Sequence, residues 1–80
     1  MFKELKEEIL KELESYHPIT GAEEFYCHYL LVEARVLKRE DLDVFSKDLS
    51  GIIGDPHVSY SFQMFLKKLI SLIREKEKIE

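Results

Sequence analysis

The sequence contains few residues that cross-link or interrupt a chain. Among its 80 residues are one cysteine, two prolines and three glycines, and there is no tryptophan. A single cysteine excludes an internal disulfide, so a disulfide-stapled secreted domain is not expected and a cytoplasmic location is predicted. No apolar run approaches the length of a bilayer-spanning helix, and the N-terminal stretch MFKELKEEILKE lacks a hydrophobic signal core. We therefore expect no membrane partner.

The sequence also has no excess of basic charge. It carries 16 acidic and 12 basic residues, which gives a net charge of −4. This balance argues against a dedicated nucleic-acid-binding protein. The sequence contains no phosphate-binding loop, no catalytic triad and no metal-ligand spacing such as HExxH or CxxC. We predict no catalytic residue, no cofactor and no bound metal, and an enzyme is not the favoured interpretation.

What the sequence does contain is helical periodicity. Hydrophobic residues recur at spacings of three and four along the chain, which predicts an all-α protein. Eighty residues make one domain, residues 1–80. We predict a small four-helix antiparallel bundle with helices at about 2–16, 21–38, 41–53 and 56–78. A chain this short buries a modest core, so we expect a homodimer to complete the bundle.

Local signals mark the boundary between the first two helices. His17 precedes Pro18, and a residue before proline is disfavoured in the helical region, so the first helix ends there. The stretch TGAE that follows fits a capping box, in which the Thr20 hydroxyl and the Glu23 carboxylate accept amides at the start of the second helix.

The later boundaries are less strongly marked. The apolar stripe of helix 41–53 is out of phase with the stripe before it, which predicts a break at residues 38–41 with Asp41 as the N-cap. One long bent helix is the alternative. Gly54 ends the third helix, and Asp55 followed by proline starts the fourth, unless that start lies instead at Ser59 or Ser61.

Residues 22–37 form the most apolar stretch, AEEFYCHYLLVEARVL. Apolar side chains cover more than half of this helix, which predicts a central helix buried on several sides. Glu33 falls among the apolar residues and must find hydrogen-bond donors or take up a proton. The favoured reading is structural, with Glu33 bonded to a tyrosine or paired with a lysine or arginine. The alternative is a carboxylic acid with a raised pKa.

The preferred functional hypothesis is a protein-interaction module: an adaptor, an inhibitor or an accessory subunit without catalysis. Helix 56–78 is much longer than helix 41–53, so part of its apolar stripe should lack a neighbour within the chain. Exposed apolar surface of this kind usually marks a partner site. A partner protein or a second copy of the chain would cover the predicted interaction surface, which consists of Phe62, Leu66, Leu69, Ile70 and Ile73.

Two alternatives place function elsewhere. A helix-turn-helix formed by the last two helices would read nucleic acid through Ser59, Ser61, Gln63, Lys67 and Lys68. A metal or enzymatic site could instead form where the first and third connections meet, from His17, Asp55 and His57, with Glu33 as a separate candidate acid. Cys27 is expected to pack as a small buried hydrophobe, and His28 to lie on the surface.

Overall fold

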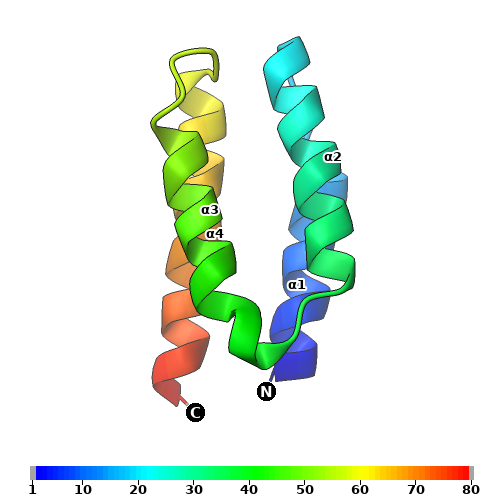
Figure 1. Ribbon diagram of the computed structural model, residues 1–80, viewed down its shortest axis with the longest axis vertical. Helices are drawn as coiled ribbons and strands as arrows, with labels where there is room; N and C mark the ends of the chain where they lie inside the picture. The colour runs from blue at the N-terminus through cyan, green and yellow to red at the C-terminus, as the bar shows by residue number, and fades with distance from the viewer. Residues whose placement is uncertain (1, 80) are drawn as a thin grey trace.

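The computed structural model describes residues 2–79, and side chains through residue 76. Four α-helices run in alternating directions, with both ends of the chain at one end of the molecule (Figure 1). They are α1 (Phe2–Ser15), α2 (Gly21–Arg35), α3 (Leu42–Ile53) and α4 (Tyr60–Ile79), and a short 3-10 helix, η1 (Arg39–Asp41), precedes α3. No strand occurs within residues 2–79. The predicted all-α four-helix bundle is confirmed.

The helices pack as two antiparallel hairpins. α1 packs on α2, α3 packs on α4, and the two hairpins meet where α1 contacts α4. α2 and α3 lie on the same side of the molecule, in front of the other two helices in Figure 1, and do not pack closely against each other. We call the line along which α2 and α3 face each other the α2–α3 seam.

The core fills the space enclosed by the four helices. Each helix contributes residues spaced three or four apart, because these positions share one helix face. Aromatic rings gather near one end, where Tyr16 stacks on Phe65 with ring centroids 4.4 Å apart and lies 5.4 Å from Phe62. The largest fully buried apolar side chains are Leu5, Ile9, Leu13, Leu30, Phe45, Leu49, Phe62, Leu66, Leu69 and Ile73.

The apolar stripe of α4 is buried inside the chain, contrary to the expectation that part of it would be exposed. All five residues of the predicted interaction surface are 0–8% exposed: Phe62, Leu66, Leu69, Ile70 and Ile73. The expectation compared the length of α4 with that of α3 and did not include the other helices. α1 also packs on α4, so two helices rather than one cover the stripe. This stripe is not an accessible surface in the described structure.

The predicted break before α3 is confirmed. α2 ends at Arg35 and η1 occupies residues 39–41, so the chain does not form one long helix. Asp41 directly precedes α3 as predicted, but its side chain does not cap that helix. Its carboxylate accepts the backbone amide of Lys38 at 3.3 Å instead and closes the turn of η1.

The fourth helix begins later than the favoured prediction. α4 starts at Tyr60, and the Ser59 hydroxyl accepts the amide of Phe62 at 3.2 Å, so the alternative start at Ser59 is the correct one. The reason is that Asp55 caps a turn rather than a helix, since its carboxylate accepts the backbone amide of His57 at 2.8 Å.

Candidate interaction surface

The stretch that the sequence marks as most apolar exposes several of its large apolar side chains. Phe25, Tyr29 and Val32 on α2 are 67%, 46% and 49% exposed, and Val36, directly after the helix, is 70% exposed. The prediction that this helix is buried on several sides is therefore wrong. α2 contacts α1 but does not pack closely on α3, so only its inward face is covered. These four residues are spaced by four, three and four positions, so they form one continuous row, the α2 stripe.

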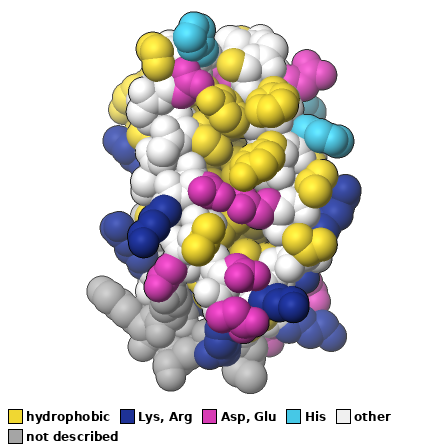
Figure 2. All heavy atoms as spheres, in the orientation of Figure 1, with side chains coloured by type: hydrophobic (Ala, Val, Ile, Leu, Met, Phe, Trp, Pro, Cys, Tyr) yellow, Lys and Arg dark blue, Asp and Glu magenta, His cyan; other side chains and the backbone are white. Residues whose placement is uncertain are grey.

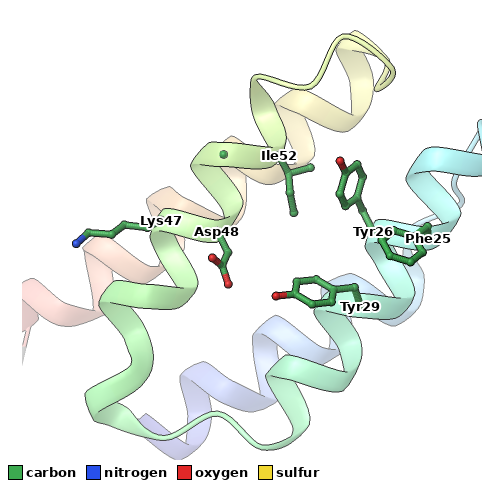
Figure 3. Close-up of a pocket in the computed structure, with 7 residues that line it drawn as sticks. Phe25, Tyr26, Tyr29, Lys47, Asp48 and Ile52 are labelled. Atoms are coloured by element: carbon green, nitrogen blue, oxygen red, sulfur yellow. The ribbon is translucent and has the colours of Figure 1, made fainter.

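The α2 stripe borders a groove at the seam. The groove has a volume of about 370 Å³, and Val44 on α3 is a further exposed apolar residue, 57% exposed. Figure 2 shows hydrophobic side chains gathered along this face, with acidic side chains among them. In Figure 3 the hydroxyl of Tyr29 points from α2 toward Asp48 on α3. The residues that line the groove are Phe25, Tyr26, Tyr29, Lys47, Asp48, Gly51 and Ile52.

Two carboxyl groups face each other across the seam. The Glu33 oxygen Oε1 is buried and has no hydrogen-bond partner among the described residues. The pKa of Glu33 is raised from 4.5 to about 7. Burial is the largest cause, followed by the hydrogen-bonding carboxyl of Asp48 and then by the charge of Asp41. The tyrosine or basic partner expected for Glu33 is not found for that oxygen. Two carboxylates cannot donate to each other, so this pair requires a proton or an external donor.

Gly51 lies on the groove side of α3 without a structural requirement for glycine. A Cβ atom added there would meet nothing within 4 Å, and no glycine among the described residues has a positive φ. Glycine within a helix costs about 1 kcal/mol relative to alanine. No contact within the folded chain requires a glycine at this position. The missing side chain leaves the α3 backbone open to close approach from outside.

The predicted polar site is only partly assembled. His57 Nδ1 lies 3.0 Å from Asp55 Oδ1, and the Tyr26 hydroxyl donates to Asp55 Oδ2. The hydrogen bond from Tyr26, followed by those from His57, lowers the pKa of Asp55, and the same bond raises the pKa of Tyr26. His17 lies exposed in the α1–α2 connection, and none of these hydrogen bonds involves it. The assembly holds the α3–α4 turn against α2.

Glu23 is a buried residue whose full role the sequence did not reveal. Its amide donates to the Thr20 hydroxyl at 3.1 Å, which confirms the first half of the predicted capping box. Its carboxylate accepts the amide of Ile19 at 3.1 Å and that of Ser59 at 2.6 Å. The bond to Ser59 spans 36 positions and joins two connections, so no local pattern could have indicated it.

Cys27 and His28 lie where they were expected. Cys27 is buried on α2, and burial, followed by the negative charge of Glu23, raises the pKa of its thiol. A raised thiol pKa disfavours the nucleophilic thiolate. His28 is exposed beside Phe25 and is not among the residues that line the groove.

The helix-turn-helix alternative lacks its geometry. α3 and α4 run alongside each other as an antiparallel hairpin (Figure 1), whereas a helix-turn-helix crosses its helices steeply. Phe62 and Leu66 occupy the inward face of α4. Of the basic residues proposed to contact phosphate, Lys68 lies 3.3 Å from the Glu12 carboxylate on α1.

Within residues 2–79, no helix combines the length and apolarity required to cross a bilayer. The described side chains contain no group of three or more His, Cys, Asp or Glu residues placed to hold a metal ion. Comparison with known proteins gave no match to a family model, to a curated protein or to a solved structure.

Proposed function

We propose that this protein is a helical interaction module that binds a partner protein through the α2–α3 seam. The observation that carries the proposal is the row of exposed apolar side chains in the α2 stripe, which borders a groove. Contiguous exposed apolar surface rimmed by polar residues is typical of protein-binding sites. An adaptor, an inhibitor or an accessory subunit would each use such a surface without performing chemistry.

The surface differs from the one expected on α4. Self-association through α4 loses its stated reason, because Leu69, Ile70 and Ile73 are covered within the chain. The seam offers a homodimer an apolar surface instead, since Tyr29 and Val32 remain exposed there. A measurement of the oligomeric state in solution tests directly whether the protein is a homodimer.

Site-specific photo-crosslinking in the source cell tests the proposed function. A photoreactive residue in place of Val32 lies in the middle of the α2 stripe, and one in place of Lys11 lies on the exposed side of α1. We expect a discrete crosslinked protein from the first position and none from the second. The product should disappear when Phe25→Asp is added, because a charge would disrupt apolar contact. Equal crosslinking from both positions, or none from Val32, would reject the proposal.

A further inference from the structure

We propose that the α2–α3 seam binds an amphipathic helix of a partner protein, with an arginine or lysine of that helix pairing with Asp48 beside Glu33. This inference rests on the proposed function and specifies the chemistry of the partner. It draws on the shape of the stripe, the position of Gly51, and the Asp48 carboxyl beside the unpartnered oxygen of Glu33.

The shape of the surface matches a helix. From Phe25 to Val36 the α2 stripe extends over about 16 Å at the rise of an α-helix, or roughly three turns. Helices that bind in grooves contribute anchors at positions i, i+3 or i+4, and i+7. The spacing of the stripe has the same period, so side chains of a docked helix can interlock with it.

Gly51 supplies room for that helix. It lies on the groove wall of α3, and the space beside its Cα is empty. Helices approach closest where one of them carries a small residue, because the backbones can then touch. A partner helix against Gly51 would use a feature for which the chain itself has no use.

The charge at the seam selects a basic side chain. Glu33 Oε1 is buried without a donor, and Asp48 lies within hydrogen-bonding reach on the opposite helix. An arginine can donate to two carboxyl groups through its planar fork, and a lysine can bridge them as a point charge. Asp41 adds negative charge nearby, and Lys47 is the one basic residue among those lining the groove. In Figure 3 the Lys47 side chain points away from Asp48.

The same charges disfavour a second copy of this chain as the occupant. A symmetric dimer presents the same patch from both protomers, so acidic groups near the centre of the patch face their own copies. Glu33 and Asp48 would then meet the partner's Glu33 and Asp48 without an added cation. The net charge of −4 works in the same direction. A basic helix from a different protein has no such conflict.

Selection from a displayed library of amphipathic helices, each of about 18 residues, tests the proposal. The library fixes an apolar stripe and randomises the positions beside it, and the folded full chain is the bait. We expect binders to enrich arginine or lysine at one of the randomised positions beside the apolar stripe. Replacing that residue with glutamine in a selected peptide should weaken binding by about tenfold.

Variants of the bait locate the contact. Asp48→Asn should weaken the selected peptide by about tenfold, whereas Asp43→Asn, which removes the same charge from α3 outside the seam, should not. Gly51→Ala should raise the urea midpoint of the free protein but weaken its binding to the selected peptide. Phe25→Asp alters an exposed residue and should abolish binding without unfolding the chain.

The outcomes separate the two proposals. Suppose that the selected peptides fail to bind the Phe25→Asp variant but are not enriched in arginine or lysine, or that they bind the Asp48→Asn variant as tightly as the wild type. Either result overturns the inference and leaves the proposed function standing. A selection that yields no binder sensitive to Phe25→Asp overturns both. Sedimentation that shows a wild-type dimer dissociated by Phe25→Asp assigns the seam to a second copy and overturns the inference.

Discussion

The carboxylate of Glu23 accepts the backbone amide of Ser59 at 2.6 Å and so joins the α1–α2 connection to the α3–α4 connection. The side chain is fully buried, and its other oxygen accepts the amide of Ile19 at 3.1 Å. Burial raises the pKa of Glu23, but the amides of Ser59 and Ile19 outweigh it, so that the pKa lies below 4.5. One carboxylate therefore holds the two hairpins together at the end of the molecule where the seam begins.

Replacement of Glu23 should destabilise the fold. In Glu23→Gln the charged carboxylate that accepts two backbone amides is replaced by a neutral amide, whose NH₂ group faces other donors. We therefore expect the free energy of unfolding to fall by about 2 kcal/mol. Because the folded-state pKa lies below the unfolded value, the stabilisation is present above about pH 4.5 and disappears as the pH falls through the folded pKa. Urea unfolding at neutral and acidic pH measures both effects. Glu24→Gln, at an exposed neighbour, should change little, and a loss as large as that of Glu23→Gln would contradict the assignment.

Glu33 should have the opposite pH dependence. Its folded-state pKa of about 7 lies above the unfolded value of 4.5, so the folded state binds more protons between these values. The free energy of unfolding should fall as pH rises through this window and level off above it. Glu33→Gln should match the wild type near pH 4.5 and exceed it by about 1 kcal/mol at pH 8, allowing for solvent screening. A difference independent of pH would refute this.

A direct titration checks the cause of the Glu33 shift. Carbon-13 NMR should show the Glu33 carboxyl titrating near 7. Burial is the largest cause of the raised pKa of Glu33 and the Asp48 carboxyl is the next, so in Asp48→Asn this pKa should move only part of the way toward 4.5.

The stripe of α4 should behave as core. Leu66→Ala should lower the free energy of unfolding by about 2–5 kcal/mol, because it leaves a cavity between helices. Met64→Ala, on the exposed side of the same helix, should change it by less than about 0.5 kcal/mol. Ile70→Lys should give a chain that no longer folds, as seen by circular dichroism, since it buries a charge without a partner. A folded Ile70→Lys monomer from a dimeric wild type would restore the original assignment of α4 as an interface.

The Tyr26 hydroxyl should contribute through Asp55. Tyr26→Phe removes the donor to the Asp55 carboxylate and should lower the free energy of unfolding by about 1 kcal/mol. The pKa of Asp55 should rise toward its ordinary value, because this hydrogen bond is the main cause that lowers it. Urea unfolding and carbon-13 titration of Asp55 measure the two effects. Tyr60→Phe, at an exposed tyrosine, serves as the control and should leave both quantities unchanged.

The sequence predicted those parts of the fold that depend on neighbours along the chain. The four helices, the break before α3 and the Thr20 cap all follow from spacing, phase and local hydrogen bonding. Glu33 was recognised as anomalous for the same reason, since its apolar neighbours lie on its own helix. Helical periodicity reports these relations because it is a property of one segment.

The sequence did not predict which apolar faces are covered. The number of apolar residues around a helix does not indicate how many other helices pack on it. The sequence therefore predicts a buried α2 and a partly exposed α4, and both predictions are wrong. The packing of α1 on α4 closes one side, and the separation of α2 from α3 opens the other. The second bond of Glu23 and the empty space beside Gly51 also depend on tertiary structure.

Because Cys27 is buried, the reactivity of its thiol reports on local opening of the fold. It is the one cysteine in the sequence, and in the folded state its thiol is shielded on the inner side of α2. A disulfide reagent can reach it only after the hairpins separate or the chain unfolds. When closing is faster than modification, the labelling rate under native conditions gives the free energy of that opening. Kinetics of thiol exchange can thus compare how firmly the bundle closes with and without a bound helix, on the unmodified protein.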